Sequence, residues 1–545
     1  MTTTNARAAA LLLGALGLAC GGDGAGDSTT APSSSTASAP LNVVASTKIR
    51  VTLGADGRLV YYSDAKGDIV PDFSHAGYGG GGVRLPNVPI VITLTPVAGD
   101  DRANIQAALD AAGRLPADAN GFRGAVLLKA GRYEVADSLL INRSGVVLRG
   151  EGQGADGTLI VATGAGTRNL IRVQGAGTRA EVAGTRQAIT TPYVPVGERR
   201  FDVGNGAAFA AGDAVVVYHE TNQDWIDAIG VDSCATRGGS YDRSDDDGLT
   251  CLQSPWTPSS VGYERTVTAV SGNTLTIDVP LVQALDATFG GGAIAKYTFA
   301  GRIRNCGVEN LRGDSEYASA TDTDHASYLV SLAAVDDAWV RDVTALHFVH
   351  GAVNPRAGAR RVTVQDSTAL DPVSGTGGGL AFHVDDGQLT LIQRCSSRQG
   401  RRDFVSGSAV PGPNVFLDTL AEQSFSDSGP LTRYATGTLY DNVTHHPQVR
   451  NVILGVEQRG NAGGGQGWAG AQQMFWNCVS DEHKVEQASP YFHNWSFGCR
   501  APVQRAHPAG IGEYESFQAP LNPRSLYLKQ LEDRLGAQAV QNIAR

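Results

Sequence analysis

The sequence is short of positive charge and of long apolar runs. Its 44 Lys and Arg residues are outnumbered by 54 Asp and Glu residues, which gives a net charge of -10 over 545 residues. Because a nucleic-acid partner needs a basic surface that neutralises phosphates, this balance argues against nucleic-acid binding. The apolar run near the start, from Ala8 to Ala19, is too short to persist as a membrane-spanning helix.

Cysteine spacings that would hold a metal are also missing. The seven cysteines include no C-x-x-C or C-x-x-H pattern, so a zinc site has no support. No cofactor is expected, and calcium is the one ion left open. Cys306 and Cys395 could equally be buried thiols inside the fold. Two disulfides are candidates in an exported chain, Cys234 with Cys251 and Cys478 with Cys499.

The first forty residues predict export rather than folded structure. The apolar run follows Arg7 and ends at Leu16-Gly17-Leu18-Ala19-Cys20, which resembles a bacterial lipoprotein signal. Residues 1–20 are therefore expected to be a signal that ends at a lipidated Cys20, with an ordinary secretory signal as the alternative. Residues 21–40 contain only Gly, Asp, Ser, Thr, Ala and Pro, which predicts a flexible tether. The expected location is the cell envelope, with a lipid anchor on the extracytoplasmic side, or secretion.

Short strand-like segments recur through the second half of the chain. Each ends in a polar turn, roughly two to three dozen residues after the one before, at Asn310, Asp342, Asp366, Cys395, Asp418 and Asp441. Units this short and this rich in β-branched residues predict a strand solenoid, here a right-handed parallel β-helix. The 68 glycines agree, because many tight turns need a positive φ. Equivalent residues on neighbouring coils would lie ~4.8 Å apart, which suits a long repetitive polymer.

The chain divides around this repeat. An amphipathic pattern over 100–112 predicts a helix that caps the first coil. The strands after residue 195 alternate around a long polar loop and predict a small β-barrel-like insertion, which could roof one end of a groove. A monomer is expected. The predicted order is 41–195 for N-terminal strands, cap helix and first coils, 196–283 for the insertion, 284–515 for the main coils and 516–545 for a C-terminal helix and tail.

Two stretches resemble a known family. Gly131-Arg132-Tyr133-Glu134-Val135 and the Gly-rich strand at 145–152 look like the opening of the pectate-lyase-like superfamily. The segments 412–418 and 435–443 resemble a bacterial subgroup of it, and the resemblance covers about 70–195 and 295–500. It implies a right-handed parallel β-helix and a polysaccharide partner. It does not imply one reaction, because lyases, hydrolases and tailspikes share this opening.

Four segments align on an aromatic residue and predict a site. Phe348, Phe382, Phe404 and Tyr434 are expected to point inward. Since side chains alternate along a strand, their neighbours should face outward. The predicted outer set is His347, Asp403 and Arg433 in one row and His383 in the next, with Arg401 and Arg402 beside Asp403.

This cluster has the groups needed for acid–base chemistry on a uronate. The favoured hypothesis is a polysaccharide lyase that acts by β-elimination. Arg402 and Arg433 would hold the sugar carboxylate. The base would be one of His347, His383 and Tyr434. The predicted catalytic set is His347, His383, Arg402, Asp403, Arg433 and Tyr434, and the predicted substrate-binding set is Asp324, His325, His350 and Arg401.

Two alternatives remain open. A glycoside hydrolase would pair Asp403 with Asp324 or Asp385. Asp385 and Asp386 would both serve only if their segment is a turn, because neighbours on a strand point opposite ways. A non-catalytic glycan-binding surface protein is the third hypothesis. It is favoured because the resembling subgroup carries His where this chain has Leu431 and Gln466.

Overall fold

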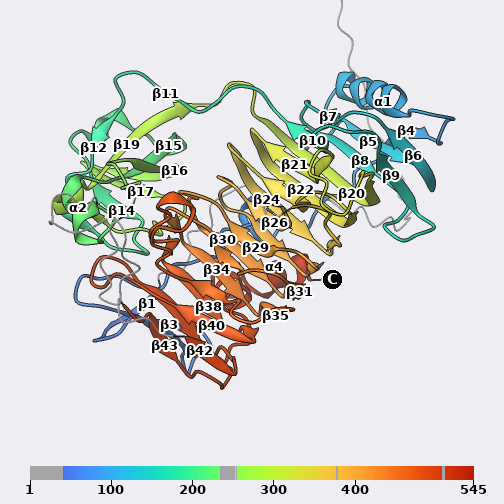
Figure 1. Ribbon diagram of the computed structural model, residues 1–545. Helices are drawn as coiled ribbons and strands as arrows, with labels where there is room; N and C mark the ends of the chain where they lie inside the picture. The colour runs from blue at the N-terminus through green and yellow to red at the C-terminus, as the bar shows by residue number, and fades with distance from the viewer. Residues whose placement is uncertain (1–40, 233–251, 253, 376–377, 506–509, 545) are drawn as a thin grey trace, which may run out of the picture. The chain divides into compact units, whose positions relative to one another are not determined.

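Long ladders of parallel strands dominate the computed structural model, which describes residues 41–232, 252, 254–375, 378–505 and 510–544 (Figure 1). We name three sheets. Sheet I contains β7 (Leu139–Ile141), β10 (Arg168–Gln174), β21 (Ala326–Ala333), β23 (Gly351–Pro355), β26 (Leu380–Val384), β29 (Arg402–Ser406) and β32 (Gly429–Pro430).

Sheets II and III share two long strands, β20 (Ile303–Ser315) and β22 (Val335–Leu346). Sheet II also contains β4 (Ile90–Leu94), β5 (Gly124–Leu128), β8 (Val146–Arg149), β24 (Ala359–Gln365), β27 (Leu391–Gln393), β30 (Asn414–Leu417), β34 (Thr438–Asp441), β38 (Gln473–Trp476), β41 (Asn494–Phe497) and β43 (Glu513–Glu515). Sheet III adds β6 (Gly131–Val135), β9 (Thr158–Ala162), β25 (Thr368–Leu370), β28 (Ser396–Arg398), β31 (Leu420–Ser424), β35 (Thr444–Pro447) and β39 (Val479–Ser480).

Strands of consecutive coils pair in parallel in all three sheets, for example β22 with β24 and β26 with β29. Side chains from the three sheets meet in one continuous core, which includes Leu148, Val340, Phe348, Phe382 and Phe404. The predicted parallel β-helix is therefore confirmed. Shorter parallel pairs continue it, namely β33 (Ala435–Thr436) with β37 (Gly470–Ala471), and β36 (Leu454–Val456) with β40 (Glu482–Val485) and β42 (Val503–Arg505).

The sequence repeat has its cause in a backbone corner. Between sheets II and III, one residue of each coil adopts a left-handed conformation with φ between 50 and 56, at Asn310, Asp342, Asp366, Arg394, Asp418, Asn442 and Asn477. Asn and Asp tolerate this region better than other non-glycine residues. The predicted position of the corner residue is correct at Asn310, Asp342, Asp366 and Asp418. It is one residue late at Cys395 and one residue early at Asp441.

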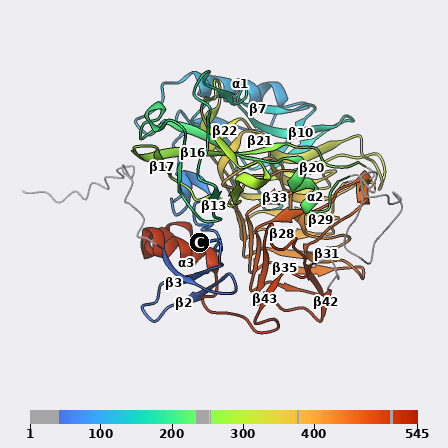
Figure 2. The same ribbon diagram turned by 90° about the vertical axis from the view of Figure 1, so that its left-hand side faces the viewer.

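Helices cover one end and one side of the coil stack. Helix α1 (Arg102–Arg114) buries Ile105, Ala108 and Leu109 against the first coils, so the predicted cap helix is confirmed (Figure 1). Helices α3 (Leu526–Leu535) and α4 (Ala537–Ile543) pack with the small sheet β1 (Asn42–Ala45), β2 (Arg50–Leu53) and β3 (Leu59–Ser63) (Figure 2). Together they bury the outer side of sheet II, including Leu417, Leu439 and Trp476. The side chains of sheet II under these helices are therefore closed to a ligand.

An antiparallel sheet interrupts the coils (green in Figure 1). Its strands are β11 (Ala180–Glu181), β12 (Gln187–Ala188), β14 (Arg200–Asp202), β15 (Ala214–Glu220), β16 (Ser260–Ser271), β17 (Thr274–Ile277) and β19 (Gly292–Thr298), and β13 (Tyr193–Val194) pairs with β18 (Leu285–Asp286). It has its own core around Phe201, Val217 and Leu275. The sheet extends beyond the predicted 196–283 because β11, β12 and β19 complete it from either side.

The described cysteines are thiols. Cys306, Cys395, Cys478 and Cys499 are buried and unbonded, which confirms the thiol alternative for the first two. The predicted Cys478–Cys499 disulfide is wrong, although the two residues follow the paired strands β38 and β41. Cys20, Cys234 and Cys251 lie outside the described residues. Across the part of the chain that the structure describes, no helix is long and apolar enough to cross a membrane.

Candidate functional site

The outer face of sheet I carries two polar rows created by the strand register. Pairing across consecutive coils aligns Arg172, Ser331, Asn354, His383 and Val405 in the first row. Two residues further along each strand, the same register gives Gln174, Ala333, Arg356, Asp385 and Gly407. Neighbours within a row stand about 4.8 Å apart at the backbone, as parallel pairing requires. Arginine, histidine and carboxylate groups therefore share one face.

Tyr328, His350 and His383 form a cluster beside these rows. The Tyr328 hydroxyl lies 3.2 Å from Nδ1 of His383, and the His350 ring stacks on Tyr328 with 4.9 Å between centroids. Burial lowers the pKa of His383, which the charge of Asp385 opposes and that of Arg356 reinforces. Burial and the nearby His383 lower the pKa of His350 to about 4. Both imidazoles are therefore neutral at pH 7.

His383 does not present an open nitrogen to a ligand. Its Nε2 atom is buried and has no hydrogen-bond partner among the described residues, and the same holds for Nδ1 of His350. A Cβ at Gly407 would lie 3.3 Å from that Nε2 atom, so the glycine backs directly onto the ring. The predicted role of His383 as a solvent-facing base therefore has no geometric support. Its ring instead supports the Tyr328 hydroxyl.

His347 and Asp314 form the accessible acid–base pair. Asp314 lies near the end of β20 and His347 directly follows β22, so adjacent coils bring them together. Nδ1 of His347 lies 2.7 Å from Oδ1 of Asp314, and the two side chains are 30% and 31% exposed. The ring of Tyr317, a residue that is 46% exposed, lies 5.4 Å from the imidazole. The carboxylate fixes one ring nitrogen and leaves Nε2 for a ligand.

Asp403 is buried, and the predicted outward direction is wrong. Its carboxylate accepts a hydrogen bond from Ser397 at 2.7 Å and another from Ser424. The register places Asp403 opposite Ala381, a residue of the central core. Because each coil turns into sheet I at this position, two successive residues, Asp403 and Phe404, both point inside. Burial raises the pKa of Asp403 to about 6.

Tyr434 is also withdrawn from any ligand. The predicted inward direction holds for Phe348, Phe382 and Phe404, which belong to the central core. Tyr434 instead packs outside that core, edge-on to Trp225 of α2 (Gln223–Ala228) at 5.0 Å and to Phe492 at 5.4 Å. Its hydroxyl donates to Gln283 at 3.3 Å. The insertion therefore covers Tyr434, which removes it as a base.

The three predicted arginines occupy different environments. Arg402 is largely buried and lies 3.8 Å from Asp427, and burial together with Arg459 lowers its pKa to about 10. Arg433 is exposed and reaches Ser254 at 3.4 Å. Arg401 is half-buried and has neither an ion pair nor a hydrogen bond to any described residue. Arg401 and Arg433 therefore both lack a counter-charge among the described residues, and Arg401 makes no other side-chain contact of that kind there.

The remaining predicted residues divide in the same way. Both nitrogens of the buried His325 are engaged, Nδ1 with Ser315 at 2.8 Å and Nε2 with the Val373 carbonyl at 2.9 Å, so this ring supports the fold. Asp324 is exposed on the neighbouring loop. Asp385 and Asp386 lie in a bend, which is the geometry in which both could serve. Desolvation and the charge of Asp385 raise the pKa of Asp386 to about 6.

Among the described residues, one cluster brings possible metal ligands together. Asp64, Asp68 and His493 place ligand atoms within 4.8 Å of one another. However, Asp68 already accepts hydrogen bonds from the Tyr193 hydroxyl at 2.6 Å and the Val196 amide at 2.8 Å, and His493 contacts Glu513 at 2.8 Å. These contacts are typical of a hydrogen-bonded cluster.

Sequence reasoning missed Asp314, Tyr317, Tyr328 and Arg356. Tyr328 and Arg356 were detectable in principle, since each lies in or directly after a strand of sheet I. Asp314 carried no comparable pattern, because its importance depends on the neighbouring coil.

No protein-family model matches this chain, and no curated protein sequence does. Solved structures similar to it include a polygalacturonase from Erwinia carotovora ssp. carotovora, at 10% identity over 80% of this chain and 98% of that chain, with a TM-score of 0.36. The mannuronan C-5 epimerase AlgE6 A-module of Azotobacter vinelandii matches at 12% identity over 79% and 95%, with a TM-score of 0.32. A Pseudomonas phage phi297 tailspike matches at 12% identity over 77% and 74%, with a TM-score of 0.29. At such scores the fold assignment depends on the strand pairing itself.

Proposed function

We propose that this protein cleaves a uronate-containing polysaccharide by β-elimination. The observation that supports this most strongly is the His347–Asp314 pair, whose 2.7 Å contact orients an accessible imidazole beside the exposed ring of Tyr317. A base held by a carboxylate is a recurring arrangement for proton abstraction. An exposed aromatic ring next to it offers an apolar face to a sugar.

The reaction needs a base and a cation. Nε2 of His347 would take the proton from the carbon that bears the sugar carboxylate, and the C–H electrons would form a carbon–carbon double bond as the glycosidic oxygen departs with its bonding pair. Asp314 would stabilise the imidazolium, and a proton from water would neutralise the departing oxygen and complete the step. Arg401 would neutralise the sugar carboxylate. The backbone before β29, where Arg401 lies, is two coils from the backbone of His350, which follows His347 by three residues. The Gly379 amide donates to the Val349 carbonyl and the Arg402 amide donates to the Gly379 carbonyl, so the two backbones lie about 10 Å apart.

The reaction is tested by incubating the protein with a panel of uronate polysaccharides. Ultraviolet absorbance of unsaturated uronates and the release of reducing ends are followed together. A rise in both supports the proposal, and a His347→Ala variant should slow both by about 10²–10⁴-fold. Reducing ends that appear without the ultraviolet band would refute elimination.

A glycoside hydrolase is the second candidate. It is favoured by Asp386, because a pKa near 6 suits a general acid and Asp385 stands beside it. An active hydrolase would produce reducing ends alone, and it should lose activity in Asp386→Asn while His347→Ala remains active. Asp403 cannot take part, because it is buried.

A purely binding role is the outcome if neither product appears on a glycan that does bind. The loss of His at Leu431 and Gln466, where the resembling subgroup carries it, would then account for the missing activity. Leu431 directly follows β32 of sheet I, and the Gln466 carbonyl accepts a hydrogen bond from the Arg433 amide at 3.3 Å. Both residues therefore lie at the end of sheet I that the insertion covers, away from His347.

We also propose that the mature chain begins at a lipidated Cys20 and acts as a monomer on the extracytoplasmic side of the cell envelope. The support is the sequence pattern that ends at Cys20 and the polar tether after it. Mass spectrometry of the mature N-terminus tests the anchor. An unmodified terminus at another residue would rule it out.

A further inference from the structure

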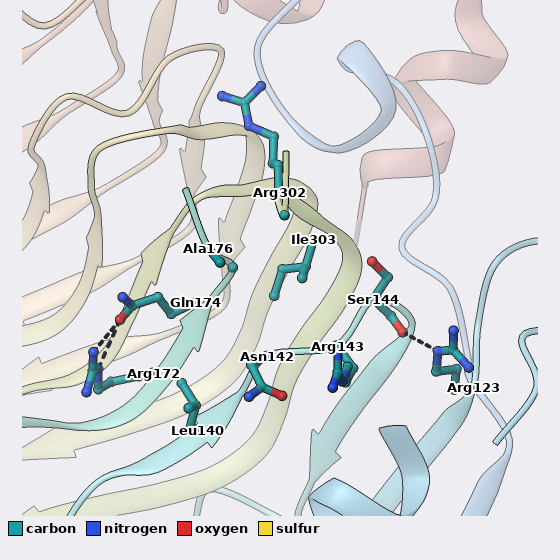
Figure 3. Close-up of a pocket in the computed structure, with 12 residues that line it drawn as sticks. Arg123, Leu140, Asn142, Arg143, Ser144, Arg172, Gln174, Ala176, Arg302 and Ile303 are labelled. Carbon is teal, nitrogen blue, oxygen red and sulfur yellow. Dashed lines mark hydrogen bonds between the residues drawn. The ribbon is translucent and has the colours of Figure 1, made fainter. Parts of the chain in front are cut away.

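A cavity of about 530 Å³ opens on the first coils of the β-helix (Figure 3). It is formed where β7, β10 and β20 end or begin, at the edge of sheet I. Four arginines line it, together with polar side chains of Asn142, Ser144 and Gln174. For a protein whose net charge is -10, this is an unusual local excess of positive charge.

Three of these arginines have no carboxylate partner among the described residues. Arg172 gives both of its hydrogen bonds to the neutral amide of Gln174, one of them at 3.1 Å. Arg123 donates to the backbone carbonyls of Ser144, at 3.1 Å, and Leu115. Arg143 makes no side-chain hydrogen bond or ion pair to any described residue. Figure 3 shows Arg172 on one side of Asn142 and Arg143 with Arg123 on the other.

The fourth arginine provides an internal comparison. Arg302 points away from the other three in Figure 3 and meets Glu264 through two contacts, at 2.6 and 2.9 Å. The fold therefore neutralises the arginine that faces the insertion and leaves the other three without a counter-charge from any residue that the structure describes. Like charges held around one cavity repel each other, and a bound anion relieves that repulsion. Guanidinium groups are well matched to planar or tetrahedral oxyanions, which they bind through paired hydrogen bonds.

The register connects this cavity to the two polar rows on the outer face of sheet I. Arg172 and Gln174 are the first members of the two outward rows that continue to His383 and Asp385. Three coil steps separate Arg172 from His383, about 14 Å along the sheet. A linear ligand that lies along sheet I would thus place one of its units over the cavity.

We propose that this cavity is an oxyanion subsite that binds an acidic group of the saccharide, either a carboxylate or a sulfate. The identification of the ligand as a saccharide rests on the proposed function. The presence of an anion site rests on the three arginines alone. Arg143 and Arg172 contact the anion, and Arg123 fixes the cavity wall through its backbone contacts.

Titration calorimetry in the His347→Ala background tests the subsite without cleavage of the ligand. The probes are a uronate oligosaccharide, its carboxyl-reduced neutral form, and a sulfated version of that neutral form. We expect Arg143→Gln/Arg172→Gln to weaken uronate binding by at least about tenfold. The double variant removes the charged donors that hydrogen-bond the anion, and such bonds contribute more to affinity than bonds between neutral groups. The matched control is Arg450→Gln/Arg500→Gln, which removes the same charge from two exposed positions and should retain binding.

The outcomes separate the two proposals. Tight binding of only the sulfated probe, lost in the cavity variant, supports the subsite and identifies its anion as a sulfate. Equal binding of charged and neutral probes, or equal losses in both double variants, overturns it. If the cavity variant does not fold, Arg172→Gln alone and the salt dependence of wild-type binding decide, since an anion site weakens with ionic strength and a neutral one does not. Absence of cleavage by the wild type, with this binding intact, refutes the lyase and leaves the subsite standing.

Discussion

Nδ1 of His347 and Oδ1 of Asp314 lie 2.7 Å apart although 33 residues separate them in the chain. The contact exists because β20 and β22 are consecutive strands of the same parallel ladder, so that the end of one coil meets the end of the next. Each residue alone is an ordinary surface group. Together they form an oriented base.

The first prediction concerns this pair. His347→Ala should reduce turnover by about 10²–10⁴-fold, the usual contribution of a positioned general base. Asp314→Asn should reduce it less, because the imidazole remains but loses its orientation. His446, which lies 3.1 Å from Asp481 on another exposed corner, is the matched control. Steady-state kinetics in which His446→Ala impaired activity as much as His347→Ala would contradict the assignment.

The second prediction concerns Asp403 and the stability of the fold. Its folded pKa of about 6 lies above the ordinary value of 3.8, so the folded state holds the proton more tightly. The stability contribution is present below about pH 4 and is lost as the pH rises to about 6 and beyond, by an amount of about 3 kcal/mol. Asp403→Asn should therefore raise the urea midpoint at pH 7. A midpoint that falls at pH 7, as for an ion-paired carboxylate, would contradict this.

The third prediction has the opposite sign in an overlapping pH range. The folded pKa of His350, about 4, lies below its ordinary value of 6.5, so the unfolded chain binds the proton more tightly. Stability from this group is present above about pH 6.5 and is lost as the pH falls towards 4, by at most about 3 kcal/mol and less because the ring is partly exposed. His350→Phe keeps the stack on Tyr328 and should flatten the acid limb of the urea midpoint. An unchanged acid limb would mean that the ring is well solvated.

The fourth prediction separates a buried position of sheet I from an exposed position that follows its last strand. Phe404 stacks on Phe382 at 5.6 Å inside the coils, so Phe404→Ala should destabilise by roughly 3–5 kcal/mol. Arg433 is exposed, and Arg433→Ala should change stability by less than about 0.5 kcal/mol. Urea denaturation of both variants checks this. The reverse order of effects would contradict the burial of Phe404 and the exposure of Arg433.

Local rules explain why parts of the site could be predicted. His347 and Phe348 follow one another at a corner, and alternation correctly separates the half-exposed ring from the buried one. Alternation fails at Asp403 because the coil turns there, and two successive side chains enter the core. It fails at Tyr434 because a helix from the insertion covers that residue, and nothing near Tyr434 in the sequence announces Trp225.

The sequence by itself determined the repeat, and with it the coils. Asn and Asp at positions such as Asn310 and Asp342 tolerate the left-handed corner, and the short β-branched segments between corners form the strands. The tertiary structure alone decided which side chains meet. The contact of His347 with Asp314 and the separate positions of Arg172 and Arg143 around one cavity depend on coil stacking. Stacking joins residues through space at about 4.8 Å per coil, whatever their separation along the chain.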